Sequence, residues 1–300
     1  MQSNAAIAAI TGIIYNTPQD PHIETMNHKL TKGLLSILLL LMSTFSFAQS
    51  TQKTKLYLIG TVHEASAILN PQMLFEILDS IQPNVLLQEN DSEQIATYFD
   101  DIRPTSNEQN ASLMYIKKYP ATLNLPFEFE GRNRYRKNNG MTPTDRLAIQ
   151  LMDSLYENKL LSKTNRKRYK SYKDANKALI DFSKKGIAAM NSMEFEQLNR
   201  HRQEIQHHQL PKIVHSEAIF AEQFVTKPDG EKISYRDGYQ LWCNFWDLRN
   251  NAMALNIIKQ ANLHKGKTIV VLTGVQHKYY LKELLTKYYD GNYTIIEYFQ

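Results

Sequence analysis

The chain has 300 residues, of which 42% are hydrophobic and 22% charged, and its formal net charge is +5. This is a globular composition, and the length suits one domain or two closely packed ones. The single cysteine, Cys243, excludes an intramolecular disulfide. Because Cys243 lies among apolar residues, we expect it to be a buried structural thiol.

Near the N-terminus a short basic stretch precedes the apolar residues 33–45, and the small residues around Ala48 follow. This pattern predicts a signal peptide over residues 26–48, since the apolar part is shorter than the about 20 residues of a membrane span. An uncleaved anchor is the alternative. Residues 1–25 would be an upstream extension from a misassigned start. Residues 49–300 would form a single domain, periplasmic or secreted after cleavage near Ala48, with no stable membrane span.

The next stretch predicts strand, helix and strand. An apolar run over residues 56–59 ends at a glycine, and His63 follows just past the predicted strand. Residues 70–83 predict a helix that starts with an Asn-Pro pair and ends at a proline. Residues 85–87 predict a second strand, which finishes at Glu89. Two such strands form a parallel pair with a crossover between them, so we expect Glu89 to lie beside His63.

The middle of the chain predicts helical turns over residues 92–118 and a third strand over residues 123–129. Pro126 suggests that this strand lies at an edge of the sheet. The strand would end at Glu130, which places a third acidic residue at a strand end.

A long helical region follows, from Thr142 to about Val225, without a strand signal. We interpret it as a large helical insertion between two halves of a sheet domain. Its basic residues crowd between positions 159 and 185. A solvated helical face is the ordinary interpretation, and an anionic surface as partner is the alternative. No nucleic-acid motif is present, so no nucleic-acid partner is expected.

The last part predicts a helix over residues 239–262 that contains Arg249, a strand over residues 268–273, and a strand over residues 293–298. Gly274 and His277 follow the second of these elements and repeat the strand-Gly-x-x-His pattern of His63. The predicted fold class is therefore α/β, with a mostly parallel sheet core, flanking helices and the helical insertion.

Ligands of such sheets bind beyond the carboxyl ends of the strands, where His63, Glu89 and His277 would meet. Two imidazoles and a carboxylate with one open position can hold a catalytic divalent metal, here Mn, Co or Zn, which activates a bound water. Arg249 could stabilise an oxyanion or hold a substrate carboxylate. Either Glu64 or Glu130 could serve as the base. A histidine after a strand can also be a structural cap.

Four short motifs carry a family resemblance: GTVH at 60–63, the acidic end of NVLLQEN at 84–90, LRNNAMALNI at 248–257 and GVQH at 274–277. In this order they resemble the signatures of the TraB/GumN family, whose relatives include the Tiki metalloproteases, the erythromycin esterases and haem-binding ChaN-like lipoproteins. The resemblance implies an α/β core with His63, Glu89, Arg249 and His277 around one cleft. In the Tiki branch it implies a divalent-metal-dependent peptidase. Tyr280 stands where the family commonly has a glycine.

The leading hypothesis is thus a secreted metal-dependent hydrolase, a peptidase acting on a peptide substrate. One alternative is an esterase of the erythromycin-esterase type, acting on a small ester. Another is an exported haem- or metal-binding protein without turnover, in which one histidine is an axial ligand and Tyr279 or Tyr280 assists. The last is a non-enzymatic exported protein whose basic insertion meets an anionic surface.

Overall fold

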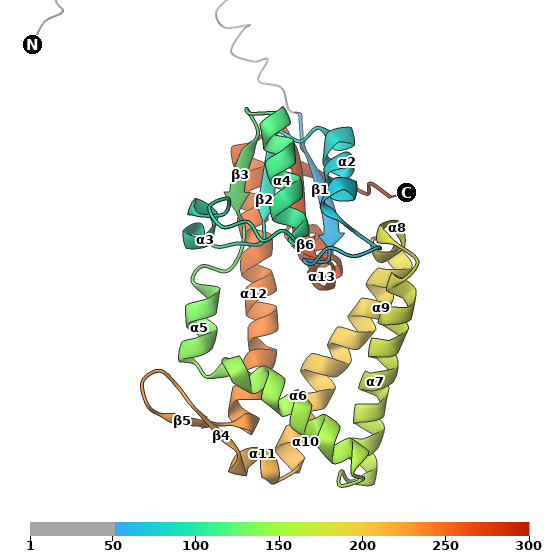
Figure 1. Cartoon of the computed structure of the whole chain (residues 1–300), viewed down its shortest axis with the longest axis vertical. Coiled ribbons are helices and arrows are strands. Elements are labelled where there is room, and N and C mark those ends of the chain that lie inside the picture. The colour runs from blue at the N-terminus through green and yellow to red at the C-terminus, as the bar shows by residue number, and fades with distance from the viewer. Residues whose placement is uncertain (1–51, 300) are drawn as a thin grey trace, which may run out of the picture. The chain divides into compact units, whose positions relative to one another are not determined.

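The computed structural model describes residues 52–299, so the predicted upstream extension and signal peptide lie outside the described residues. Within them, five strands form one parallel sheet with helices on both faces (Figure 1). The predicted α/β fold class is confirmed. In sequence order the strands are β1 (Thr54–Thr61), β2 (Val85–Gln88), β3 (Leu123–Pro126), β6 (Thr268–Gly274) and β7 (Tyr293–Ile296).

The order of strands in the sheet is β3-β2-β6-β1-β7. The late strand β6 therefore lies between β1 and β2, and the direct pairing of β1 with β2 expected from the sequence is wrong. β6 pairs with β1 through Leu58 and Val271, and with β2 through Leu87 and the same Val271. Most residues of β6 are buried, as expected for a central strand that is covered on both faces of the sheet.

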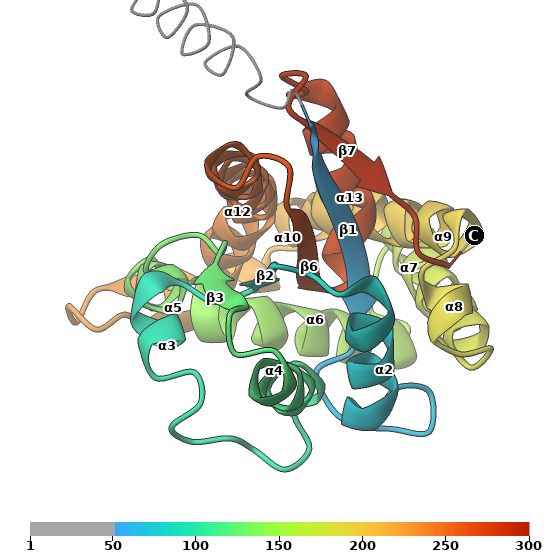
Figure 2. The same cartoon turned by 90° about the horizontal axis from the view of Figure 1, so that it is seen from above.

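Alternate residues of the strands feed two hydrophobic layers. On one face the sheet packs against α12 (Tyr235–Leu263) and α13 (Val275–Lys287). On the other face it packs against α2 (Pro71–Ile81) and α4 (Asn107–Lys118). Figure 2 shows these two pairs of helices on opposite sides of the strands. As predicted, α2 begins at an Asn cap: the side chain of Asn70 accepts a hydrogen bond from the backbone N–H of Met73 at 3.0 Å.

The predicted helical insertion is present, and it extends beyond the carboxyl ends of the strands (Figure 1). Its core contains Met152, Tyr169 and Ile213, together with Tyr239 and the buried Cys243 of α12. The elements are α6 (Met141–Glu157), α7 (Lys163–Ser183), α8 (Ile187–Met190), α9 (Met193–Glu204), the π-helix η1 (Ile205–Gln209), α10 (Leu210–Ser216) and α11 (Ile219–Glu222).

A short hairpin of β4 (Phe224–Thr226) and β5 (Lys232–Ser234) follows the insertion. The sequence shows no signal for β4, because three residues are too few for a period of two to be seen. The helix after the hairpin, α12, also starts four residues earlier than expected. Ser234 caps it by accepting a hydrogen bond from the backbone N–H of Asp237 at 3.0 Å.

The helix α12 connects the two halves of this unit, since its first turns pack in the core of the insertion and its later turns pack on the sheet. Two shorter helices, α3 (Ser92–Ala96) and α5 (Arg132–Asn138), lie near the carboxyl ends of β2 and β3. Among residues 52–299, no helix combines the length and the apolar character needed to cross a membrane.

Candidate active site

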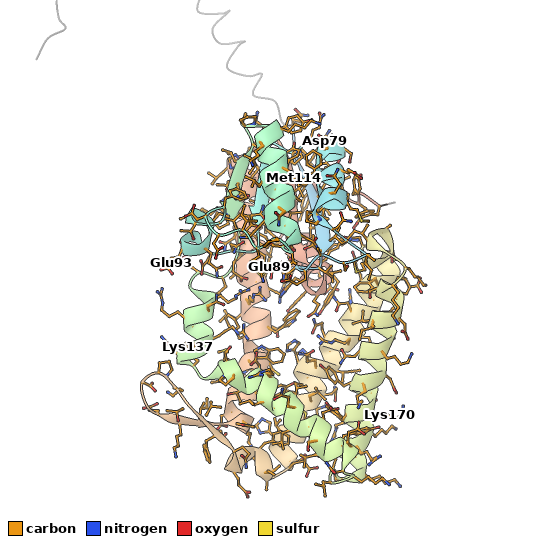
Figure 3. All side chains as sticks on the ribbon, viewed as in Figure 1. Asp79, Glu89, Glu93, Met114, Lys137 and Lys170 are labelled. Atoms are coloured by element: carbon orange, nitrogen blue, oxygen red, sulfur yellow. The ribbon has the colours of Figure 1, made fainter. Side chains whose placement is uncertain are left out.

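The carboxyl ends of β1, β2 and β6 bring three predicted residues to one point beside Gly274. A Cβ atom built on Gly274 would lie 3.5 Å from Glu89 Oε2, 3.6 Å from His63 Nε2 and 3.8 Å from His277 Cδ2. Both histidines thus lie next to the same carboxylate, as the sequence predicts. Figure 3 shows Glu89 at the end of the sheet that faces the helical insertion.

Arg249 of α12 joins this group through a cluster of buried charges. Its Nη2 donates to Glu89 Oε1 and to Glu128 Oε2, each at 2.5 Å, and its Nε donates to Glu128 at 3.0 Å. Arg132 donates from Nη1 to Glu128 Oε2 at 2.8 Å. Two carboxylates therefore face two guanidinium groups, which keeps the buried cluster electrically balanced.

The carboxylate of Glu89 is held by β6 as well as by Arg249. Its Oε2 accepts hydrogen bonds from the Thr273 hydroxyl at 2.8 Å and from the Gly274 backbone N–H at 2.7 Å. Burial alone would raise the pKa of Glu89, but the Arg249 charge and the Gly274 N–H hold it well below its usual range. Glu89 is therefore ionised and fully hydrogen-bonded.

His277 is buried, and both of its ring nitrogens are engaged. Asn250 donates from Nδ2 to the backbone carbonyl of Trp246 at 2.7 Å, so its Oδ1 faces His277 Nδ1, also at 2.7 Å. This arrangement assigns the ring proton to Nδ1, and Nε2 then accepts from Arg249 Nη1 at 2.8 Å. Burial and the charge of Arg249 lower the pKa of His277 to about 3. His277 is thus neutral and has no free lone pair.

His63 has a different environment, because its side chain is 60% exposed and pairs with a carboxylate. Its Nδ1 lies 3.0 Å from Glu108 Oε1, which also accepts a hydrogen bond from the Thr61 hydroxyl at 2.5 Å. The hydrogen bond with Glu108 raises the pKa of His63, although partial burial opposes this effect. With Nδ1–H directed to Glu108, the Nε2 lone pair of His63 faces the space beside Gly274.

His63 opens onto a cleft of about 330 Å³. Its walls are mostly polar and charged, which differs from the wide apolar slot that a haem would need. Among the lining residues are His63, Glu89, Tyr98, Arg103, Glu108 and Arg132. Tyr279 and Tyr280, considered from the sequence as helpers of a haem site, line a separate cavity of about 280 Å³ together with Trp246.

Glu130 does not join the site. It is exposed and accepts hydrogen bonds from the backbone N–H of Ser92 at 3.3 Å and from its hydroxyl at 2.5 Å, at the start of α3. The third acidic residue of the site is Glu128 and not the predicted Glu130. The reason is that β3 ends at Pro126, earlier than the predicted residue 129. Glu128 and Glu130 are two residues apart, so in an extended segment both share one face and the sequence does not distinguish them.

Glu64, the other candidate base, is also exposed and pairs with Arg103 at 2.9 Å. Sequence reasoning missed four residues of the site: Glu108, Glu128, Arg132 and Asn250. The only signals for them were the early proline in the third strand, for Glu128, and the spacing of one turn between Asn250 and Trp246 on a helix.

The predicted metal ligands His63, Glu89 and His277 do not fit a metal as they are arranged. Arg249 Nη1 lies 2.8 Å from His277 Nε2, so a guanidinium stands where the metal would have to bind. Accordingly, no group of three or more His, Cys, Asp or Glu side chains in residues 52–299 is arranged to hold a metal ion.

The basic stretch of the insertion maps largely onto α7. Several of its lysines pair with acidic side chains nearby, as in Lys170 with Asp174 at 2.7 Å and Lys173 with Glu157 at 2.5 Å. Lys177 and Lys184 both pair with Asp181. Local pairing thus accounts for part of this charge, and an anionic partner stays a prediction.

Comparison with known proteins does not assign a family to the chain. No protein-family model matches the chain, and no curated protein matches it. Among solved structures, the chain is similar to a mutant of the erythromycin esterase EreC in its open conformation, with 10% identity and a TM-score of 0.31. The match covers 83% of this chain and 70% of that chain. A TM-score this low assigns neither a family nor a function.

Proposed function

We propose that the protein is a hydrolase of ester or amide bonds in which His63 activates water. The observation that carries this proposal is the pair of His63 and Glu108 at the mouth of the cleft. A carboxylate fixes one nitrogen of an exposed imidazole, and the other nitrogen faces a polar space large enough for a substrate group. This is the arrangement of a general base with its orienting carboxylate.

In the proposed reaction, His63 Nε2 takes a proton from water, and the resulting hydroxide attacks the carbonyl carbon. Glu108 stabilises the imidazolium that forms. Arg132 lines the cleft with 22% of its side chain exposed, so its guanidinium can stabilise the oxyanion of the tetrahedral intermediate. The intermediate then expels the alcohol or amine, which receives the proton from His63.

The buried cluster has a positioning role in this scheme. Glu89, Glu128 and His277 together hold Arg249, and Glu128 also holds Arg132 at the wall of the cleft. The cluster therefore fixes the positive charge next to the reacting group before the substrate arrives.

A metal-dependent peptidase, the leading hypothesis from the sequence, is the second candidate. Two of its three ligand atoms, His63 Nε2 and Glu89 Oε2, do lie close to one point beside Gly274. The third would require His277 to exchange its contact with Arg249. The assay with a chelator, and with Mn, Co or Zn added back, tests whether activity depends on a metal and on which one.

The test is turnover of a panel of small esters and a peptide library by the purified chain. Each assay is run with a chelator and with Mn, Co or Zn added back. We expect ester or amide turnover that survives the chelator and is lost in His63→Ala. Glu64→Gln is the matched control, since it removes a neighbouring exposed carboxylate and should leave turnover unchanged. Full turnover in His63→Ala contradicts the proposal, and loss with the chelator favours the metal-dependent peptidase.

Export to the periplasm or the medium remains part of the proposal, with peptides or small esters outside the inner membrane as substrates. N-terminal sequencing of the protein recovered outside the cytoplasm tests it. A first residue near Gln49 is expected, and a start at residue 1 or 26 contradicts cleavage.

A further inference from the structure

The solvent-facing side of α12 carries a stripe of exposed leucines. Leu241, Leu248 and Leu255 keep 38%, 49% and 54% of their surface exposed. They are seven residues apart, so they lie along one line of the helix, which is 29 residues long or about 44 Å. An exposed leucine by itself is ordinary, but three in heptad spacing on one long helix form a surface suited to a second helix.

The sequence of this face is symmetric about Leu248. Leu241 and Leu255 lie seven residues before and after it, and Asp237 and Lys259 lie eleven residues before and after it. Asp237 and Lys259 are both exposed and fall on the same side of the helix as the leucines. This face has leucines in the middle, a negative charge at one end and a positive charge at the other end. When two copies of it are placed antiparallel, leucines meet leucines and opposite charges meet at both ends.

We propose that two copies of this chain associate through this face of α12, with the two helices antiparallel and the twofold axis at Leu248. Leu248 then meets Leu248 of the second copy, and Leu241 meets its Leu255. At each end Asp237 of one copy meets Lys259 of the other. The same patch serves on both copies, as an isologous interface requires.

Charge selects the antiparallel pairing over the parallel one. In a parallel pair Asp237 would face Asp237 and Lys259 would face Lys259, and like charges in these positions are destabilising. Space also permits the contact, since Figure 2 shows α12 at the edge of the molecule, away from α2 and α4. Arg249 follows Leu248 directly but points about 100° away around the helix, into the buried cluster and not into the leucine stripe.

Cysteine crosslinking tests the pairing, because the native Cys243 is buried and does not compete. Under mild oxidation Leu248→Cys should crosslink with itself. Leu241→Cys and Leu255→Cys should crosslink only when the two variants are mixed. Leu160→Cys, which replaces an exposed leucine outside α12, is the control and should not crosslink. Self-crosslinking of Leu241→Cys and Leu255→Cys shows a parallel pair and overturns the proposal, as does a control that crosslinks equally.

Sedimentation equilibrium of the full chain tests the energetics. Leu248→Ser should weaken the dimer about tenfold or more, whereas Leu160→Ser should not weaken it. Lys259→Glu should weaken it by placing two acidic groups together, and adding Asp237→Lys to the same chain should restore it. Circular dichroism confirms that each variant is folded. A wild-type chain that stays monomeric at its highest soluble concentration, or a dimer that these substitutions leave unchanged, overturns the proposal.

Discussion

The two strand-Gly-x-x-His units have the same sequence pattern but different physical environments. His63 is exposed, has a carboxylate on one nitrogen and presents the other nitrogen to the cleft. His277 is buried, with an asparagine on one nitrogen and a guanidinium on the other. One imidazole is therefore available for proton transfer, and the other is a fixed hydrogen-bond acceptor.

The difference arises from the elements that surround each histidine. His63 lies on a loop after β1, and its ring pairs with Glu108 of α4 while 60% of the side chain stays exposed. His277 lies in the first turn of α13, under α12, where Trp246 stacks on its ring at 4.5 Å. The repeated motif thus sets the backbone position of each histidine at a strand end. The contacts from neighbouring helices set its pKa and therefore its role.

The sharpest way to break this comparison is to remove each imidazole in turn. His63→Ala should lower kcat by about 1,000-fold or more, because the general base is lost. His277→Gln should lower kcat only about tenfold, since it removes one hydrogen bond to Arg249. Steady-state kinetics on any substrate of the panel that the wild-type chain turns over gives both values. Equal losses in the two variants would mean that the histidines share one role.

The guanidinium beside His277 is the next test. Arg249→Met leaves Glu89 and Glu128 buried without their shared partner and should lower the free energy of unfolding by about 3–5 kcal/mol. The matched control is Arg103→Met beside His63, whose pair with Glu64 is exposed and screened by solvent, so its loss should change the free energy of unfolding far less. Urea unfolding measures both. Equal urea midpoints for the two variants would contradict the claim that Arg249 balances the buried charges of Glu89 and Glu128.

Acid stability sharpens the comparison further. Unfolded His277 takes up a proton as the pH falls through 6.5, whereas folded His277 stays neutral until about 3, so stability is lost on acidification. Each such histidine removes about 1.4 kcal/mol per pH unit in this window. The buried His207, whose pKa is also lowered by burial, adds to the slope.

The measurement is urea unfolding of wild type and variants between pH 6 and pH 4.5, above the range in which most carboxylates titrate. His277→Gln should flatten the slope, and His201→Gln, an exposed control, should leave it unchanged. An unchanged slope in His277→Gln would show that this imidazole is protonated in the folded protein.

The smallest effect concerns the partner of His63. Glu108→Gln removes the carboxylate that raises the pKa of His63, so the acid limb of kcat/KM should move to lower pH. The plateau should fall about tenfold, because the imidazolium is less stabilised. Glu64→Gln serves as the control again. If the acid limb of kcat/KM does not move in Glu108→Gln, His63 is not the group that takes the proton in the rate-limiting step.

Most of the fold could be predicted from the sequence, because apolar runs that end at glycine or proline mark strands and helices clearly. The order of the strands could not be predicted. A strand as apolar as β6 fits any central position, and only its contacts with β1 and β2 place it between them.

The site could be predicted in part. The strand ends brought His63, Glu89 and His277 together with Arg249, as expected. Glu108 lies in the first turn of a polar helix and Arg132 in a run of basic residues, and neither setting differs from an ordinary solvated surface. The spacing of motifs also gives no sign that Arg249 enters between Glu89 and His277, which is the contact that argues against the predicted metal ligands. The TraB/GumN resemblance itself stays a prediction.

Titration of the histidines by NMR, with His63 and His277 assigned through their Gln variants, tests the central claim most directly. We expect His63 to titrate with a pKa raised above its usual range by Glu108, and His277 to stay neutral with its proton on Nδ1 down to a pH near 3. Two imidazoles that titrate together, or His277 gaining its proton before His63, would contradict the assignment of different roles to the two motifs.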